Sequence, residues 1–376
     1  MKDINNRRSF IKKAVAISSA TMLGIKSGFS LNKTASMKLH SVKKIKPLGF
    51  QWETQDPFLF CVHHEDYFPK GNEKMEPAAE LLQGRNIGQD FVIKDGFRMY
   101  HGQTIPGFPG HPHRGFETVT VVREGMVDHS DSLGGACRYG NGDVQWMTAG
   151  KGVQHAEMFP LIHSDKDNPM ELFQIWLNLP KASKFVSPHY KMLWEDSIPK
   201  YINKDAKGLQ TKVELIAGKI EKTKAPAPPP NSWAANNENE VAIWNIHMDA
   251  GAIWQLPKAT EGVNRTLYFY KGDKLKIDGI EVANYHSAEI DVSADLTIEN
   301  GNDKGFVLIL QGKPINEPVV QYGPFVMNSK KEIQDAFSEY QETQFGGWPW
   351  PTNAPVHERT KGRFALHADG TIEQKG

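Results

Sequence analysis

The sequence predicts a mainly β protein that consists of two related barrels in tandem. Helical periodicity is scarce, whereas short runs rich in Val, Ile, Phe, Tyr and Trp recur along most of the chain and end in Gly, Pro, Asn or Asp. The chain has 376 residues, of which 39% are hydrophobic, so it can bury two ordinary cores. A proline-rich stretch separates two series of these runs, which predicts one barrel on each side of it.

The first segment, residues 1–36, has the features of an export signal. It starts with basic residues, carries the pair Arg7-Arg8 and continues with an apolar run, 14–23, that is too short to span a bilayer as a helix. The residues from Arg7 to Lys12 resemble the twin-arginine export signature. We therefore expect a periplasmic or otherwise exported protein without stable membrane insertion. A frayed basic tail is the alternative, and the cleavage position stays open.

Charges are distributed unevenly along the chain. Residues 1–50 contain 11 Lys and Arg and one acidic residue, so the remainder of the 44 basic and 44 acidic residues gives residues 51–376 a net charge of −10. Nucleic-acid binding needs a basic surface that neutralises phosphates, so DNA and RNA are excluded as partners. Cys61 and Cys137 are too few for a disulfide framework or a zinc finger. Whether they pair stays open, and free buried thiols are the favoured expectation.

The two β units follow each other along the chain. The first is predicted over residues 49–180 from FVIKDGF, FETVTVVREGMVDHSDS, GDVQWMTAG and ELFQIWLNLP, each closed by turn-forming residues. Residues 181–240 are predicted to be a linker, whose clearest part is KAPAPPPNSW, because consecutive prolines exclude helix and disfavour a central strand. The second unit is predicted over residues 241–328 from VAIWNIHMDAG, TLYFYKGDKLKIDG, SAEIDVSADLTIEN and FVLILQGKP.

Residues 329–376 are predicted to form a helix and a tail that packs back on the body. The stretch SKKEIQDAFSEYQET, with Ser329 as its cap, has apolar residues at helical spacing, namely Ile333, Ala336, Phe337 and Tyr340. The rest, FGGWPWPTNAPVHERTKGRFALHADG, is rich in Trp, Pro and Gly. We expect it to lack regular structure and to wrap across the body, anchored by Trp348 and Trp350.

Two pairs of polar residues predict a metal site in the first unit. His111 and His113 stand in HPHRGFET, and His155 and Glu157 stand in HAEM, which begins 42 residues after the second histidine. Residues i and i+2 of a strand point to the same face, so two such pairs on neighbouring strands would converge in the barrel interior. One pair alone is more often an accident of surface or core. The presence of two such pairs, each beside a glycine-rich turn, predicts that these four residues are metal ligands.

Three imidazole nitrogens and one carboxylate oxygen suit a divalent first-row metal. Fe(II) is the leading candidate, because histidine-plus-carboxylate sites with open positions are typical of non-haem iron oxygenases. Mn, Co, Ni, Cu and Zn accept the same ligands, so the metal is not decided by the sequence. Four protein ligands on an ion that prefers six leave room for water, substrate or O2.

Several long segments resemble those of one family. PGHPHRGFETVT, DSLGG, GDVQWMTAGKGVQHAEM and LFQIWLNLP are similar to signature segments of the pirin family, and FGGWPWP, PVH and KGRFA resemble its C-terminal end. The resemblance covers roughly residues 50–370. It implies a bicupin, that is, two cupin (jelly-roll) barrels. It also implies metal binding in the N-terminal cupin by the positions of His111, His113, His155 and Glu157, and a metal-free C-terminal cupin.

Other polar residues near these motifs carry separate expectations. The general cupin pattern offers Glu117 as a ligand, but pirin-like proteins take the carboxylate from the second motif. We therefore expect Glu117 to orient a ligand or to form hydrogen bonds within the barrel. His101 is expected to be packed or exposed, with the pocket mouth as the alternative, and His63-His64 to lie in a loop without a partner. Arg114 is expected to point away from the metal and to pair with an acid.

The resemblance implies a metal-dependent dioxygenase of the quercetin 2,3-dioxygenase type that acts on flavonol or enediol substrates with O2. Glu157 would exchange between ligand and base, because a carboxylate bound to the metal lies within reach of a substrate hydroxyl. The alternative is a bicupin without turnover that senses redox state or binds a protein through its metal. A non-oxidative metalloenzyme such as an isomerase would use the same ligands. Because two barrels are already joined in one chain, we expect a monomer.

Overall fold

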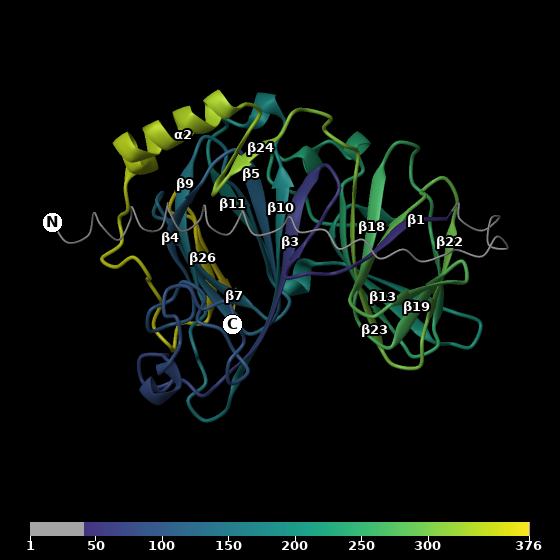
Figure 1. Ribbon diagram of the computed structural model, residues 1–376, viewed down its shortest axis with the longest axis horizontal. Helices are drawn as coiled ribbons and strands as arrows, with labels where there is room; N and C mark the ends of the chain where they lie inside the picture. The colour runs from purple at the N-terminus through teal and green to yellow at the C-terminus, as the bar shows by residue number, and fades with distance from the viewer. Residues whose placement is uncertain (1–40, 376) are drawn as a thin grey trace.

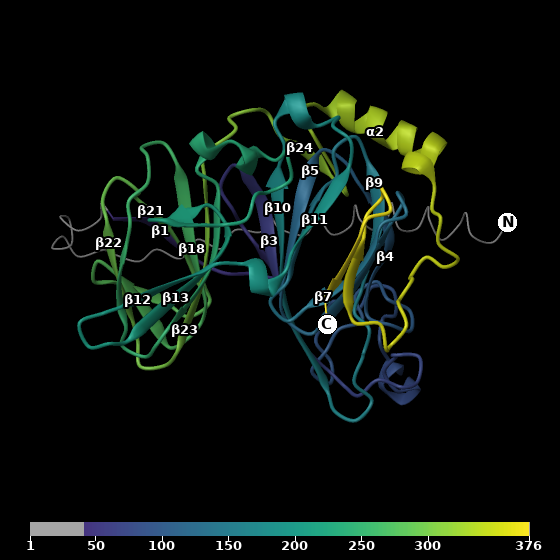
Figure 2. The same ribbon diagram turned by 180° about the vertical axis from the view of Figure 1, so that it is seen from behind.

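The computed structural model describes residues 41–375, which form two β barrels side by side (Figures 1 and 2). This arrangement confirms the predicted mainly β fold with tandem barrels. The export signal predicted over residues 1–36 lies outside the described residues. Within residues 41–375, no helix is long and apolar enough to cross a membrane.

The N-terminal barrel consists of two six-stranded antiparallel sheets. The first has the order β11-β8-β5-β10-β3-β2 and contains β2 (Gln51–Trp52), β3 (Phe58–Phe68), β5 (Phe116–Glu124), β8 (Val144–Thr148), β10 (Asn168–Asn178) and β11 (His189–Leu193). The second has the order β27-β26-β7-β6-β9-β4 and contains β4 (Gly107–His113), β6 (Met126–Asp131), β7 (Ala136–Gly140), β9 (Val153–Met158), β26 (Arg363–Leu366) and β27 (Ile372–Lys375). Apolar side chains of both sheets, among them Val122, Met147 and Val153, fill the space between them.

The C-terminal barrel pairs a seven-stranded sheet with a four-stranded one. The larger sheet has the order β1-β21-β18-β23-β16-β13-β12 and contains β1 (Val42–Pro47), β12 (Lys200–Lys204), β13 (Gln210–Ala217), β16 (Ala242–Met248), β18 (Asn264–Lys271), β21 (His286–Ile290) and β23 (Gly305–Gly312). The smaller sheet has the order β17-β22-β19-β20 and contains β17 (Ile253–Leu256), β19 (Lys274–Ile277), β20 (Ile280–Ala283) and β22 (Leu296–Asn300). Leu267, Leu275 and Ile298 belong to the apolar core between them.

The barrels pack against each other through one sheet of each. Trp52 and Tyr268 stack at this interface with ring centroids 5.2 Å apart and an interplanar angle of 13°. They belong to a buried cluster that also includes Phe173 and Ile243 from opposite barrels. Apolar burial of this kind is the main favourable term in association, so the two barrels form a single packed body.

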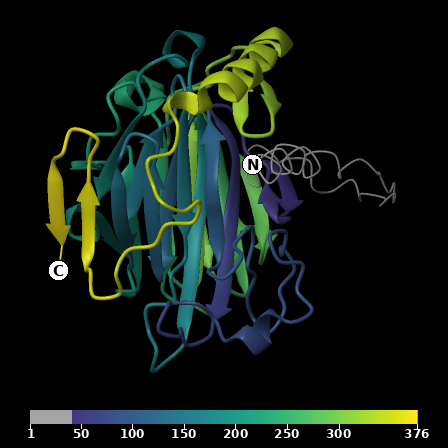
Figure 3. The same ribbon diagram turned by 90° about the vertical axis from the view of Figure 1, so that its left-hand side faces the viewer.

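The ends of the described chain cross over between the barrels. Strand β1 pairs with β21 in the C-terminal barrel, although it precedes every strand of the N-terminal barrel. Strands β26 and β27, at the yellow end of the chain, extend the N-terminal barrel through the pairing of β26 with β7 (Figure 3). The expected wrapping of the tail is confirmed, but the expected lack of regular structure is wrong for these two strands. Phe364 and Ala365 are both buried, so apolar burial on both faces of β26 holds the strand on the barrel.

The region expected to be a linker, residues 181–240, contributes strands to both barrels. It contains β11, β12 and β13, and also the hairpin of β14 (Lys219–Ile220) and β15 (Thr223–Lys224). Polar and apolar residues alternate in the run KVEL of β13, and this strand pattern was visible in the sequence. The stretch PAPPP has no regular structure, as its prolines require.

The predicted helix is α2 (Lys330–Thr343), which lies over one end of the N-terminal barrel (Figure 1). Ser329 caps it by accepting a hydrogen bond from the Glu332 N–H at 3.2 Å, as predicted. Ile333, Ala336 and Tyr340 are buried, partly against the hairpin of β24 (Val320–Tyr322) and β25 (Phe325–Met327). Six short 3-10 helices complete the described structure, namely Ala79–Leu82, Lys181–Ser183, Glu195–Ser197, Trp233–Ala235, Asn237–Asn239 and Gln344–Gly346.

Cys61 and Cys137 are buried and free, as expected. Each lies within a strand of the N-terminal barrel, on different sheets, so the fold keeps them apart. Burial raises the pKa of both thiols well above 9.0, which keeps them protonated.

Candidate metal centre

Strands β4 and β9 carry the predicted ligands side by side. The strands are antiparallel neighbours, with His111 opposite His155 and Phe108 opposite Glu157. Gly107 opens β4 with φ +130°, and a Cβ at this position would lie 2.5 Å from the carbonyl oxygen of Glu157. A residue other than glycine would therefore push the two strands apart at the point where the site is built.

The structure brings three of the four predicted ligands into one compact group. Ligand nitrogen atoms of His111, His113 and His155 all lie within 4.8 Å of one another. The Nε2 atoms of His111 and His113 are 3.1 Å apart. The Glu157 carboxylate stands beside this group, with Oε2 3.8 Å from Nε2 of His155. The i and i+2 spacing thus brings the three histidines together, and Glu157 as a fourth ligand stays a prediction.

All three imidazoles are buried, and burial sets their charge. Their exposed fractions are 8% for His111, 4% for His113 and 0% for His155. Burial lowers the pKa of His111 to about 4 and the pKa of the other two well below 6.5. The imidazoles are therefore neutral at pH 7, which is the form that offers a lone pair to a metal.

Glu157 is held in place by two polar neighbours from the facing sheet. Its Oε1 atom lies 3.0 Å from the Thr120 hydroxyl, and its Oε2 atom accepts a hydrogen bond of 2.8 Å from the Gln174 amide. Burial raises the pKa of this carboxyl above 4.5. These contacts fix the carboxylate at the edge of the histidine group, with its oxygen atoms turned toward the interior of the barrel.

The donor set fits a bound metal. Neither ring nitrogen of His155 has a hydrogen-bond partner among the described residues, although the side chain is fully buried. A buried polar atom without a partner costs roughly 1–3 kcal/mol, so such atoms in a native protein call for an explanation. A divalent cation at the meeting point of the three imidazoles would provide one, because it would take the lone pair of Nε2.

A cavity of about 240 Å³ opens onto this group. His111, His113 and Glu157 line it, and its remaining wall is mostly aromatic and aliphatic, including Phe50, Phe60, Phe91, Phe108, Phe159 and Trp176. Phe60 and Trp176 lie with ring centroids 4.3 Å apart. An apolar cavity with a few converging polar groups is the usual form of a small-molecule site.

Two histidines that line this cavity, His64 and His101, were expected from the sequence to lie elsewhere. His64 is a buried residue of β3, not of a loop, and its Nδ1 atom lies 2.8 Å from the Tyr100 hydroxyl. The neighbouring His63 contacts Glu171 at 3.1 Å, so each has a partner. His101 lines the cavity wall, which agrees with the alternative of a place at the pocket mouth. Adjacent histidines in a strand point to opposite faces, a signal that the motif FCVHHED contained.

His129 lies near the histidine group, although the sequence motifs did not single it out. It lies opposite Glu157 on the neighbouring strand β6, and its ring centroid is 5.5 Å from that of His155. Its Nε2 atom lies 3.2 Å from Asp131 Oδ2. The run DHSD has the same i and i+2 spacing as the ligand pairs, which would have marked it as a second polar layer behind the histidine group.

Glu117 and Arg114 both lie outside the lining of the metal cavity. Glu117 is fully buried away from the cavity, where it accepts hydrogen bonds from Thr148 at 2.6 Å and Ser232 at 2.5 Å. Burial raises its pKa to about 7. It is thus a structural acid that ties residues of three segments together. Arg114 points away from the site and pairs with Glu339 of α2 at 2.7 Å, as predicted.

Family models match both barrels. Residues 71–177 match the model described as pirin, and residues 243–346 match the model described as the pirin C-terminal cupin domain. The chain belongs to the pirin family. The resemblance seen in the sequence is therefore confirmed, and the histidine triad is the candidate divalent-metal site of this pirin.

Relatives of this pirin support the assignment. A Pseudomonas aeruginosa protein named "Putative quercetin 2,3-dioxygenase" is 35% identical over 282 residues, which cover 72% of this chain and 92% of that protein. The pirin of Homo sapiens is 34% identical over 262 residues, which cover 68% of this chain and 82% of the human protein. The crystal structure of quercetin 2,3-dioxygenase from Acinetobacter baumannii superposes with a TM-score of 0.62 at 26% identity, covering 82% of this chain and 96% of that one.

Proposed function

We propose that this pirin is a metal-dependent dioxygenase that acts on flavonol or enediol substrates. His111, His113, His155 and Glu157 hold the metal in this proposal, and Fe(II) is the metal favoured by the ligand set. The single observation that carries the proposal is the group of three buried, neutral imidazoles with nitrogen atoms within 4.8 Å of one another, on the wall of an aromatic cavity. The names of the relatives, which include quercetin 2,3-dioxygenase, give the substrate class.

The cavity walls suit a flat aromatic substrate. Phe60, Phe91, Phe108 and Trp176 offer ring faces and edges, and aromatic rings favour offset-stacked and edge-to-face contacts. The same walls exclude water from the reacting centre, which strengthens the electrostatic interactions inside. His111, His113 and Glu157 line the same cavity, so a substrate hydroxyl can reach the histidine group.

Glu157 takes the proton of that hydroxyl. Its carboxylate lines the cavity, and Thr120 and Gln174 fix its orientation, so a lone pair is available to a donor that enters from the cavity. A deprotonated flavonol is electron-rich and reacts with O2 far more readily than the neutral form. When bound, a first-row metal would supply Lewis acidity toward the substrate oxygen and one-electron chemistry toward O2.

Oxygen uptake by the iron-loaded protein tests the proposal. A panel of flavonols and enediols is added to the full-length protein, and O2 consumption is followed together with loss of the substrate absorbance. We expect uptake with at least one flavonol, at one O2 per substrate. His155→Ala should lose both bound metal and uptake, whereas His189→Ala, which alters an exposed histidine, should change neither.

Silence of the metal-loaded protein across the whole panel would contradict the dioxygenase proposal. Retained metal in that case would favour the alternative, a pirin that binds a partner or senses redox state without turnover. Loss of uptake in His189→Ala as well would show that the triad is not the origin of the activity.

We also propose export by the twin-arginine route, from the sequence of residues 1–36 alone. A double Arg7→Lys, Arg8→Lys change keeps the charge of the segment and removes the arginine pair. The protein should then remain in the cytoplasm of the expressing cell, whereas the unchanged chain should appear in the periplasmic fraction. Equal distribution of the two forms would contradict the proposal.

A further inference from the structure

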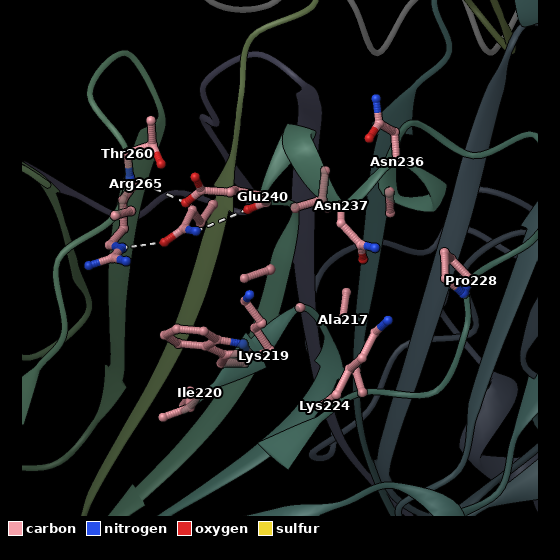
Figure 4. A pocket seen from close by; sticks show the side chains of 18 of the residues that line it. Ala217, Lys219, Ile220, Lys224, Pro228, Asn236, Asn237, Glu240, Thr260 and Arg265 are labelled. Atoms are coloured by element: carbon pink, nitrogen blue, oxygen red, sulfur yellow. Dashed lines mark hydrogen bonds between the residues drawn. The ribbon is translucent and has the colours of Figure 1, made fainter. Parts of the chain in front are cut away.

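A second cavity, larger than the one at the histidine triad, lies in the C-terminal barrel. Its volume is about 720 Å³, within the range of small-molecule sites. It is bounded by the start of β16, the β14–β15 hairpin, the proline-rich stretch and the loop after β17 (Figure 4). None of its lining residues is a histidine or cysteine, so a transition-metal site is not what this cavity offers.

The sequence explains why the space is open. Residues 225–230, APAPPP, lack most of the N–H groups that a strand would need, so this stretch stands away from the sheet as a wall. Gly218 turns the chain at φ +85°, and an added Cβ would lie 2.9 Å from Ala242 Cβ. Small side chains line the cavity where larger ones would fill it, namely Ala217, Ala225, Ala227, Ala234, Ala235 and Ala242.

Arg265 is a buried cation in the wall of this cavity. Its exposed fraction is 2%, and it donates hydrogen bonds to Gln311 Oε1 at 2.5 Å and to the Pro257 carbonyl at 2.7 Å. Both acceptors are neutral, and among residues 41–375 no carboxylate forms an ion pair with this guanidinium. Burial lowers its pKa to about 10. The carboxylates of Glu240 and Asp295 oppose this lowering, but neither forms an ion pair with Arg265 among the described residues. A buried cation without a directly paired anion is costly, so this site favours an anionic ligand.

Three lysines line the same cavity. Lys219, Lys224 and Lys258 have no side-chain partner among the described residues. In Figure 4 the side chains of Lys219 and Lys224 extend from the hairpin side toward the loop that carries Asn236 and Asn237. The side-chain amides of this loop carry N–H groups that can donate hydrogen bonds to anionic oxygen atoms.

The cavity is locally basic in a protein whose body is acidic. Two acids, Glu221 and Glu240, line it with the arginine and the three lysines, which leaves an excess of two positive charges. Glu240 is engaged with the Thr260 N–H at 3.3 Å, and Glu221 accepts a hydrogen bond from Tyr201 at 3.0 Å. Residues 51–376 as a whole carry a net charge of −10, so the cationic character belongs to this cavity and not to the surface in general.

We propose that this cavity binds a small organic anion with an apolar body, whose carboxylate or phosphate oxygens are held by Arg265 and the neighbouring lysines. The Trp244 ring and the alanine and proline side chains provide the apolar wall. The Arg265 guanidinium carbon lies 5.9 Å from the centroid of the Trp244 ring, within the range of a cation–π contact. Arg265 pairs with such oxygens in a planar, two-bond geometry that a point charge does not give.

Calorimetric titration of the metal-loaded, full-length protein tests this site. Phenyl phosphate and phthalate are the two anionic probes, which separate phosphate from carboxylate ligands, and benzamide is the neutral aromatic control. We expect at least one anion to bind with a dissociation constant below about 1 mM, and benzamide not to bind at that level. Affinity should fall as salt is raised, because charge attraction is screened.

Variants connect binding to this cavity. The double change Lys219→Gln, Lys224→Gln should raise the dissociation constant at least about tenfold, and Lys222→Gln, on the same hairpin but outside the cavity, less than about twofold. Arg265→Gln should abolish binding. Arg265 also donates hydrogen bonds to Gln311 and Pro257, so a circular dichroism spectrum must show that its variant is folded. The lysine variants alter exposed side chains only, so they test binding without this risk.

Three results would overturn the proposal. The first is failure of both anions to bind with a dissociation constant below about 1 mM. The second is binding that survives the lysine and arginine changes. The third is binding that disappears when the metal is stripped by a chelator and dialysed away, because the anion would then sit at the histidine triad. Binding of one anion but not the other supports the site and identifies its ligand class.

Discussion

The Nδ1 atom of His64 lies 2.8 Å from the hydroxyl oxygen of Tyr100. Tyr100 donates its proton to Asp66, whose Oδ2 atom is 2.5 Å away, and Arg98 binds the same carboxylate through two nitrogen atoms. Since the hydroxyl proton is directed to Asp66, the Tyr100 oxygen accepts, and the hydrogen bond assigns the imidazole proton to Nδ1. Nε2 of His64 is then an acceptor in a side chain that lines the metal cavity.

Substitution Tyr100→Phe tests the importance of this orientation. The change removes the acceptor for the Nδ1 proton, so His64 is free to present a donor to the cavity in place of an acceptor. We expect kcat/KM for a flavonol to fall about tenfold, as for a displaced proton-accepting group. The free energy of unfolding should fall by about 1–2 kcal/mol, because buried Asp66 loses one hydrogen bond.

The control for this variant is Tyr201→Phe, which removes a hydroxyl that contacts exposed Glu221. It should leave both quantities within about 0.5 kcal/mol of the parent protein. Should Tyr100→Phe show the stability loss with unaltered kcat/KM, the role of His64 in positioning substrate would be excluded.

Glu157→Gln separates metal binding from proton transfer. The amide keeps the size of the side chain and an oxygen ligand atom, but it cannot take a proton at neutral pH. We expect more than half of the metal to be retained by elemental analysis and oxygen uptake to fall by at least about a hundredfold. Glu124→Gln, at the exposed end of β5, is the matched control and should behave as the parent protein. Full activity in Glu157→Gln would remove this residue from the mechanism.

The interface between the barrels should weaken in acid through Glu214. Burial opposes its ionisation, but the Arg123 guanidinium and the Asn245 amide outweigh burial and lower the pKa of Glu214 from 4.5 to about 2. A depressed carboxyl pKa contributes stability that is complete above the unfolded value and lost as the pH falls toward the folded one. The shift corresponds to about 3 kcal/mol at pH 7 and about 1 kcal/mol at pH 3.

The variant Glu214→Gln isolates this effect. Its free energy of unfolding in urea should be about 3 kcal/mol lower than that of the parent at pH 7, and the difference should shrink below pH 4.5. Glu221→Gln, an exposed acid of the same barrel, should show a small difference that does not grow or shrink in this way. A difference that is constant from pH 7 to pH 3 would show that the Glu214 charge does not stabilise the interface.

Arg138 should hold the end of the described chain on the N-terminal barrel. It is 2% exposed, pairs with buried Asp128 through two nitrogen atoms, and donates to the carbonyl groups of His357, Glu358 and Lys361. Arg138→Ala would leave the Asp128 carboxylate buried without a partner, which costs about 3–5 kcal/mol. We expect a large drop in melting temperature and rapid proteolysis after residue 350. Thr360→Ala removes an exposed side chain of the same segment and should leave both unchanged.

The histidine triad could be predicted from the sequence because it depends on the spacing of residues within two short strands. The i and i+2 spacing fixes which side chains share a face, and a single strand pairing then sets His111 opposite His155. His64 could not be assigned in the same way. Its role depends on Tyr100, which stands 36 residues away, and on which face of β3 looks into the cavity. Neither follows from a propensity or a motif.

The same distinction explains the chain ends and the presumed linker. Helix α2 and its Ser329 cap were predictable, because helical spacing and capping involve residues within one turn. The pairing of β26 with β7 joins residues more than 200 positions apart, and a short run such as RFAL has no periodicity that identifies its partner. Residues 181–240 were predicted to be a linker because of their prolines, although the same region contains the strand pattern of β13.

The crossing of β1 into the second barrel and of β26 into the first has a consequence for biosynthesis. Each barrel includes a strand from a distant part of the sequence. The first barrel therefore leaves the ribosome with the edge of β7 unpaired, and β26, which ends at residue 366, pairs with it only later. Assembly of the first barrel is thereby postponed until the second barrel has been translated. A fragment that ends between the barrels should accordingly be captured by chaperones or degraded instead of accumulating as a functional half.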